Sequence, residues 1–352
     1  MTSDEKVAVG TKLLLRAVLM VGGIYLLYLL RDVVVVVLFS VLTAAALTPA
    51  INKLRERGVS RTMAVILAYA VLFLGGVTLV GVCIPVLFVE IKEFLSHWPQ
   101  YTEQMGVFLS GFDSYAQSFG LPFDKQAIFA DLENSAASWF GGFFSTTLNL
   151  FQGFIHIIGF FFLALYLSLE EKGIEKFFLI LTPDEYHTHA LSLASRMQGK
   201  VSQWLFGQAL LMLIAFVIYY VGLLIIGVPY ALAIAFFGGL MEIIPYIGPV
   251  LAAVPAIIIG LLYSPGLGLA ALIFYLIAHQ AEAHIIAPQV MKRSANLNPV
   301  VLIISILVGI ELGGPLGVIL AVPMTMVLSV FVEDIFEKKR RGFTGALNTC
   351  VW

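Results

Sequence analysis

Residues 62–89 read TMAVILAYAVLFLGGVTLVGVCIPVLFV, a run of 28 residues without Lys, Arg, Asp or Glu. A helix needs about 20 consecutive apolar residues to cross the hydrocarbon core of a bilayer. Three further runs of about this length lack the same four residue types, at 33–51, 143–169 and 205–228. Because core helices of soluble proteins are shorter and capped, the chain is predicted to be an integral membrane protein with several helical spans.

Composition also separates this chain from soluble globular proteins. Of its 352 residues, 60% are hydrophobic and 12% are charged, and the mean hydropathy is +0.97. A soluble domain carries about 25% charged residues. The two cysteines, Cys83 and Cys350, give neither a disulfide framework nor a metal-ligand spacing. The apolar run 17–30 follows three basic residues, as in a signal peptide, but no small-residue cleavage site follows it, so we predict a retained first span.

Basic residues predict how the spans are oriented, because Lys and Arg concentrate on the cytoplasmic side. With the N-terminus inside, 17 of the 20 basic residues fall on the cytoplasmic side, and the reverse orientation places 3 there. Both termini are therefore predicted to be cytoplasmic. Five spans are expected first, at about 13–30, 33–51, 62–89, 143–169 and 203–227. Over 230–332, shorter apolar stretches broken by Pro or Gly give six, eight or ten crossings in total, depending on how many pairs form re-entrant hairpins.

We favour about eight transmembrane helices in an all-α integral membrane protein, with Pro/Gly-broken helices or re-entrant hairpins in the C-terminal half. The helix before span 5 is predicted to start with Thr182 as its cap and Pro183 at its first position. It should run on into the span, because only Gly199 interrupts it. The predicted regions are N-terminal helices 1–3 (1–89), an external amphipathic helical segment (90–142), span 4 with a cytoplasmic linker helix (143–202), a C-terminal transmembrane core (203–334) and a basic cytoplasmic tail (335–352).

The external segment carries an apolar stripe with the period of a coiled-coil seam. Pro99 is expected to kink its start, and Asp124 to cap a second helix. Either the stripe lies on the chain's own spans or on the lipid surface, or it is a self-association seam in a homo-oligomer. We favour the first interpretation, because aromatic residues dominate where coiled coils prefer Leu, Ile and Val. The stripe consists of Ile91, Phe94, Trp98, Tyr101, Met105, Phe108, Phe112, Tyr115 and Phe119.

Isolated acids in apolar surroundings are the main candidates for function. Between residues 201 and 291 the only Asp, Glu, Lys or Arg side chains are Glu242 and Glu282, and Glu311 stands alone in the next apolar stretch. A charged group in hydrocarbon costs about 2.5 kcal/mol or more, so such acids are protonated, paired or exposed to water. Each acid is therefore either a structural, protonated glutamate or a group that carries protons, coordinates a cation or contacts a polar solute.

Glu242 opens the stretch EIIPYIGP, residues 242–249, which is predicted to break a helix. Its two prolines lack the backbone N–H that a helix needs, and its glycine permits a sharp bend. Carbonyls freed in this way must bind protein groups or line a wet cavity. A broken helix beside a buried carboxylate is the usual form of a transport site. The residues expected to contact solute or coupling ion are Glu242, Pro245, Tyr246, Gly248 and Pro249.

A second polar cluster spans residues 279–284. Gln280 and His284 share one helical face, and His279 and Glu282 share another. The two histidines point away from each other and the H-E-x-x-H pattern of zinc proteases is absent, so a polar strip on an interior face is expected in place of a metal site.

The glycines of 309–317 predict a third feature, the tip of a helical hairpin. Gly313, Gly314 and Gly317 allow a tight reversal, and Pro323 is expected to break the descending arm. The loop lacks the G-K-[ST] of nucleotide-binding loops, so transport driven by ATP bound to this chain is not expected.

The stretch EIIPYIGP is similar to the signature of the AI-2E family of transporters, also called the autoinducer-2 exporter or PerM-like family. Lys292-Arg293 departs from the family, whose members often carry Gly there. The resemblance implies about eight spans, an oligomer for which a pentamer is one arrangement, and export or exchange of a small solute. The other motifs that carry it, in family order, are Leu47-Thr48-Pro49, residues 57–61 (RGVSR), Gly207-Gln208, Gln280, Glu282, Pro288, Asn298-Pro299, Gly313-Gly314, Gly317 and Ala321-Val322-Pro323.

We therefore predict a secondary transporter in the bacterial inner membrane, coupled to protons or sodium, and not an enzyme. Its expected partners are the lipid bilayer, a small solute, H+ or Na+, and further copies of the chain, with no nucleic acid, cofactor or metal. The site is expected among the broken helix, the helix carrying Gln280 and Glu282, and the hairpin near Glu311. Two alternatives remain: a passive oligomeric pore, and a non-transporting scaffold whose external helix binds partners.

Overall fold

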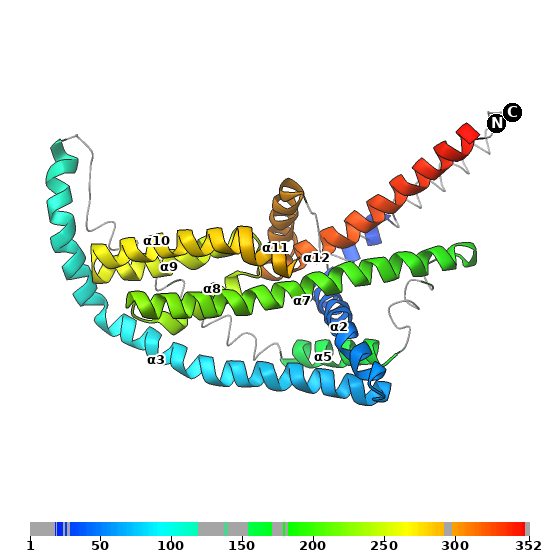
Figure 1. Ribbon diagram of the computed structural model, residues 1–352, viewed down its shortest axis with the longest axis horizontal. Helices are drawn as coiled ribbons and strands as arrows, with labels where there is room; N and C mark the ends of the chain where they lie inside the picture. Colours follow the sequence, from blue (N-terminus) through cyan, green and yellow to red (C-terminus); the bar gives the residue numbers. More distant parts are fainter. Residues whose placement is uncertain are drawn as a thin grey trace.

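The computed structural model is helical, and none of the residues that it describes lies in a strand (Figure 1). It describes residues 29–118, 154–170, 182–291 and 298–348, and also 18, 20–23, 25, 26, 138 and 179. For residues 80, 102, 104–118, 154–157 and 338–348 only the backbone is described. The all-α class predicted from the sequence is confirmed for this part of the chain.

Several described helices are suited to a bilayer. Five are long and apolar enough to cross it, namely Arg31–Glu56, Arg61–Tyr101, Asp184–Ile226, Pro265–Val290 and Pro299–Glu337. Shorter apolar helices lie at Ile158–Leu169, Ala231–Met241 and Gly248–Tyr263. These helices are those of a multi-pass membrane protein. The number of eight crossings stays a prediction, and the expected first span at 13–30 falls largely outside the described residues.

An arginine fastens the N-terminal helices together. The helices α2 (Arg31–Glu56), α3 (Arg61–Ser118) and α5 (Phe154–Leu169) pack on one another. The guanidinium of Arg61, at the start of α3, donates hydrogen bonds to the last carbonyls of α5, at 3.1 Å to Leu169 O and 2.8 Å to Ser168 O. Helix ends leave such carbonyls without helical partners and favour a nearby cation, so Arg61 closes this end of α5.

Helix α3 is continuous where the sequence predicted a boundary at 89/90. It runs from Arg61 to Ser118 through Pro85 and Pro99 and bends gradually (Figure 1). A proline removes one backbone hydrogen bond and bends a helix without always ending it. Phe94, Trp98 and Tyr101 are buried in the core that α8 and α9 share. This confirms, for these members of the stripe, that it lies on the chain's own helices; its side chains from Met105 onward lie outside the described residues.

The predicted linker helix does run on into span 5. A short 3-10 turn at Asp184–Tyr186 leads into α7 (His187–Ile226), which passes Gly199 without interruption. The start differs from the prediction by one residue, because Pro183 occupies the cap position and no side-chain hydrogen bond caps the turn. The helix ends at Gly227, whose φ of 83° lets its N–H reach the carbonyls of Leu223 and Leu224.

The C-terminal half is a series of interrupted helices. Helix α8 (Ala231–Met241) is separated from α9 (Gly248–Tyr263) by the predicted break. Ser264 divides α9 from α10 (Pro265–Ala281), and these two helices lie side by side. Helix α10 then widens into the π-helical segment η2 (Glu282–Ile286) and ends as α11 (Ala287–Val290). Pro288 thus falls just beyond the π-helical turn, which accommodates its missing N–H.

The predicted hairpin lies within α12 (Pro299–Asn348). The chain turns at Gly314 (φ 56°, ψ −140°), and Gly309 on the first arm touches Gly317 on the second. Pro323 does not break the descending arm as predicted, since α12 stays helical through it. The neighbouring turns supply enough packing, with Leu320 and Met326 both buried, to hold the helix together across one missing hydrogen bond.

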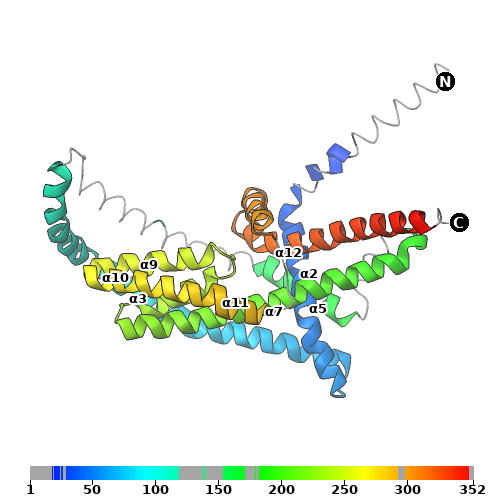
Figure 2. The same ribbon diagram turned by 45° about the horizontal axis from the view of Figure 1, so that its top comes forward.

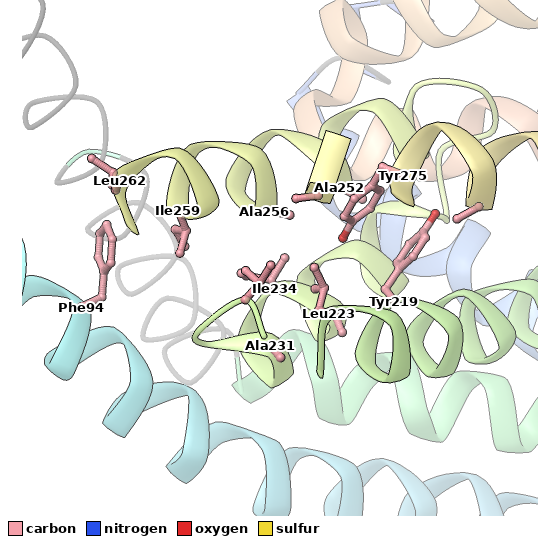
Figure 3. Close-up of a cluster of buried hydrophobic side chains, with 14 of the residues drawn as sticks. Phe94, Tyr219, Leu223, Ala231, Ile234, Ala252, Ala256, Ile259, Leu262 and Tyr275 are labelled. Carbon is pink, nitrogen blue, oxygen red and sulfur yellow. The ribbon is translucent and has the colours of Figure 1, made fainter. Parts of the chain in front are cut away.

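Two of the hydrophobic cores among the described helices bear on the C-terminal half. The larger one joins α7, α8, α9 and α10 and includes the aromatic residues of α3 (Figure 3). Alanines at its centre, among them Ala235, Ala252 and Ala271, allow close helix approach. The second core joins α2, α7 and both arms of the α12 hairpin, and Ile244 of the break packs against it. The break therefore lies where the two cores meet.

Ion pairs join the N-terminal part of α7 to the C-terminal part of α12, which run beside each other (Figure 2). Lys200 Nζ lies 2.9 Å from Glu333 Oε2, and His189 Nε2 lies 2.9 Å from Asp334 Oδ2. The ion pairs hold these two segments together; that both lie on the cytoplasmic side stays a prediction.

Glu90 of α3 completes the N-terminus of α8, because its Oε2 accepts a hydrogen bond of 2.8 Å from the N–H of Ala233. Tyr230, at the cap position, has φ 58° and makes no capping side-chain bond. We expect Glu90→Ala to lower the free energy of unfolding by about 1 kcal/mol, as loss of an N-cap does. Thermal unfolding in detergent measures this, with the neighbouring exposed Glu93→Ala as the control. Equal unfolding midpoints for the two variants would contradict the assigned role.

Candidate functional site

The break between α8 and α9 is the centre of the candidate site. Tyr246 adopts a left-handed backbone conformation, with φ 66°, which turns the chain away from the α8 axis. Gly248 is needed for space, because a Cβ there would overlap the carbonyl oxygen of Met241 and lie 3.0 Å from the Cα of Glu242. The sequence prediction of a break at 242–249 is therefore confirmed, and the chain folds back closely on itself there.

Carbonyls at the break have protein donors. Those of Met241, Ile244 and Pro245 accept hydrogen bonds from backbone N–H groups within the turn. The carbonyl of Glu242 accepts one from the side-chain amide of Gln208, on α7. We expected the carbonyls near Pro245 to bind solute or cation. Each of them already accepts one hydrogen bond, so only its second lone pair is left for such a contact. Side chains are therefore the main candidates for binding the solute or the cation.

The Glu242 side chain is enclosed. The residue is 3% exposed, and its Oε2 has no hydrogen-bond partner among the described residues. Its carboxyl group lies beside that of Glu282, which approaches from the other broken helix. With no Lys or Arg between residues 201 and 291, these two acids form a carboxyl pair in which Glu242 is the buried member. Two adjacent negative charges repel each other, and burial of one of them strengthens the effect, so the pair favours binding a proton or a cation.

Glu282 is the first residue of η2, the π-helical turn. The residue is half-buried, and its Oε2 accepts a hydrogen bond of 3.4 Å from the hydroxyl of Tyr219, on α7. Turns of π-helix are rare and often mark functional sites, because they redirect one side chain within a helix. Each member of the carboxyl pair therefore stands at an interruption of its own helix.

Two tyrosines beside the pair were not predicted from the sequence. The rings of Tyr219 and Tyr275 lie 4.8 Å apart between their centroids, and Figure 3 shows them meeting from α7 and α10. The Tyr275 hydroxyl and His279 Nδ1 are buried without hydrogen-bond partners among the described residues. Tyr275, His279 and Glu282 are spaced i, i+4 and i+7, which places them on one helical face. That spacing is the signal from which the tyrosine on α10 could have been found.

Gln280 lies on a different side of α10, as its helical position predicted, and it is exposed. It lines an open, mostly apolar hollow of about 510 Å³ together with Leu276, Ile277, Ala281, His284 and Ile285. The structure thus does not bring Gln280 to the carboxyl pair.

The other predicted site residues divide between the break and the hairpin. Pro249 and Gly248 are buried within the break, Pro245 is half-buried and Tyr246 is 57% exposed. Glu311 is exposed on the first hairpin arm, and none of the described contacts joins it to the carboxyl pair. The hairpin approaches the site instead through the core that holds Ile244. Within the described residues no three His, Cys, Asp or Glu side chains are grouped to hold a metal.

Comparison with known proteins gives a consistent result. The family model described as "AI-2E family transporter" matches residues 14–337. The putative transport proteins YrrI and YueF of Bacillus subtilis are 27% and 26% identical over 306 and 293 residues, which cover 86% and 80% of this chain and 86% and 79% of theirs. The putative transport protein YhhT of Escherichia coli is 25% identical over 326 residues, 92% of this chain and 91% of its own.

Proposed function

We propose that this chain, which belongs to the AI-2E transporter family, is a secondary transporter that exports or exchanges a small solute, coupled to protons or sodium through Glu242 and Glu282. One observation carries the proposal: Glu242 Oε2 is buried, has no hydrogen-bond partner in the described part of the chain, and lies beside a second carboxyl group at a helix break. A group in this state favours binding a cation when the site is closed and releasing it when water enters.

The surroundings of the pair support coupling rather than a passive pore. Both carboxyl groups stand at interruptions of otherwise apolar helices, where a small rearrangement alters their exposure. Tyr219 donates to Glu282, and the ring of Tyr275, whose hydroxyl has no hydrogen-bond partner within the described ranges, lies beside that of Tyr219. These hydroxyls can hydrogen-bond to a polar solute, to water or to either carboxyl group. Cation and solute would therefore bind next to each other, which is one arrangement that couples their transport.

Membrane placement extends the same proposal. We place the chain in the bacterial inner membrane with both termini cytoplasmic, which is supported by the 17 basic residues on that side and by the ion pairs joining α7 to α12. Homo-oligomer formation is proposed from the family resemblance alone, because the described part of the external stripe packs on its own chain.

The test is solute counterflow in proteoliposomes, with a panel of small polar solutes and an imposed pH or sodium gradient. Glu242→Gln and Glu282→Gln each keep the shape of the side chain but remove its ability to exchange a cation. We expect each to reduce gradient-driven accumulation by about tenfold or more, since the coupling ion then has no carboxylate to bind. The exposed Glu185, at the start of the linker helix, gives the matched control Glu185→Gln.

The outcomes separate the candidate functions. Loss of accumulation under only one of the two gradients identifies the coupling ion. Unchanged accumulation in both variants would remove the carboxyl pair from the mechanism. A wild-type flux that follows the solute gradient and ignores both pH and sodium would favour the passive pore.

A further inference from the structure

We propose that Gln208 is a positioning residue that holds the carboxyl pair in place, by giving the broken helix the hydrogen-bond donor that its own backbone lacks. The inference deepens the proposed function and rests on it for its role in transport. The contacts that α7 makes with the helices carrying Glu242 and Glu282 do not depend on that role.

The first contact is between Gln208 and the break. In a regular helix the carbonyl of Glu242 would accept a hydrogen bond from the N–H of residue 246, four positions on. Among the described residues the N–H of Tyr246 makes no hydrogen bond to this carbonyl, and the side-chain Nε2 of Gln208 donates to it instead. Gln208 is 4% exposed, so water does not readily compete for this bond. The main chain that carries the Glu242 side chain is thereby tied to α7.

The second contact joins the same turn of α7 to the other broken helix. A Cβ at Gly207 would lie 2.9 Å from Met291 Sδ and 3.7 Å from Val290 Cγ1. Val290 and Met291 end the α10–η2–α11 helix that carries Glu282. The absence of a side chain at 207 thus lets the end of that helix pack directly on α7. Two consecutive residues of α7 contact both elements that present carboxyl groups.

A third contact lies on the same face of α7. Tyr219 is eleven residues beyond Gln208, about three helical turns, so the two side chains point in nearly the same direction. Tyr219 donates to the carboxyl group of Glu282. Helix α7 therefore contacts the main-chain carbonyl of Glu242 and the side-chain carboxyl group of Glu282. Moving the main chain at Glu242 or the side chain of Glu282 away from α7 would break one of these hydrogen bonds.

Amide hydrogen exchange in nanodiscs tests the contact directly. Gln208→Met preserves side-chain length but removes the donor, and we expect the amides of residues 243–248 to exchange about fivefold faster or more, as loss of one hydrogen bond implies. Gln198, also on α7, donates at 3.0 Å to Thr48 Oγ1 of α2. Gln198→Met is therefore the matched control, and it should leave exchange at 243–248 unchanged.

A carboxyl infrared band distinguishes positioning of the pair from general support of the helix. The C=O stretch of the Glu242 carboxyl group, recorded at acidic pH and assigned by its loss in Glu242→Gln, should move to higher wavenumber in Gln208→Met, because the displaced group loses its hydrogen bond with Glu282. Gln208→Glu provides a second variant, which donates only when protonated. Amide exchange at 243–248 in Gln208→Glu, corrected for intrinsic rates, should be close to the wild-type value in acid, where the new carboxyl group can donate. At neutral pH it should be close to the value in Gln208→Met.

Either of two results would overturn the proposal. Wild-type exchange at 243–248 in Gln208→Met would show that the amide does not hold the break. Faster exchange with an unmoved Glu242 band would show that Gln208 supports the helix without placing the pair. Should both readouts change while Glu242→Gln transports normally, the positioning role stands and the proposed coupling role of the pair fails.

Discussion

Gly248→Ala is expected to destabilise the protein by about 3 kcal/mol or more and to abolish coupled transport, because the new methyl group has no room. Its carbon would overlap the carbonyl oxygen of Met241 and lie 2.7 Å from the carbonyl carbon. Both are backbone atoms, so no side chain can move aside to relieve the contact. The start of α9 would have to move away from the end of α8, and Glu242 lies at that junction.

Two measurements check this expectation. Thermal unfolding in detergent gives the loss of stability, and hydrogen exchange at 240–250 shows whether the damage is centred on the break. Gly266→Ala is the control, because nothing lies within 4 Å of a Cβ there and alanine suits the first turn of α10. If Gly248→Ala unfolded at the same temperature as Gly266→Ala, the close return of the chain described above would be wrong.

Interruptions could be predicted from the sequence because their causes are local. Pro245, Pro249 and Gly248 act within a few residues of themselves, so the break at 242–249 followed from backbone chemistry alone. The reversal at 309–317 followed from its glycines for the same reason. Pro323 shows the limit of that approach, because the tertiary packing around α12 keeps a proline-containing turn helical.

Partners across helices could not be predicted in the same way. Glu242 and Glu282 were identified as isolated acids, but their pairing depends on how α8 and α10 pack on α7. Tyr219 and Gln208 lie in an apolar run, where a tyrosine or glutamine gives no sign of what it contacts. Glu90 marked the end of a span in the sequence, and only the tertiary structure reveals that it completes α8.

Gln280 illustrates a conflict between two kinds of inference. Its helical position placed it away from Glu282, whereas the family resemblance grouped the two residues in one motif. The structure follows the helical geometry, with Gln280 exposed and Glu282 turned toward Tyr219. A shared motif therefore does not make the two residues neighbours in one site.

Gly317→Ala is the second substitution with a large expected effect, because it would force apart the two arms of the α12 hairpin. A Cβ at Gly317 would overlap the carbonyl oxygen of Gly309 and lie 2.8 Å from its carbonyl carbon. The contact is mutual, since a Cβ at Gly309 would lie 2.5 Å from the oxygen of Gly317. With backbone on both sides, we expect a loss of about 3 kcal/mol or more in the free energy of unfolding.

The damage should reach the carboxyl pair through the second core. Leu302 and Val318, from the two arms, share that core with Ile244 of the break, so separated arms leave the break without its support. Gly317→Ala should therefore accelerate hydrogen exchange at 243–248 as well as at the hairpin, and lower coupled transport. Gly199→Ala is the control, because it replaces a helical glycine with nothing within 4 Å and should raise stability slightly. Faster exchange confined to the hairpin would mean that the hairpin and the carboxyl pair are mechanically independent, and that the core around Ile244 transmits nothing between them.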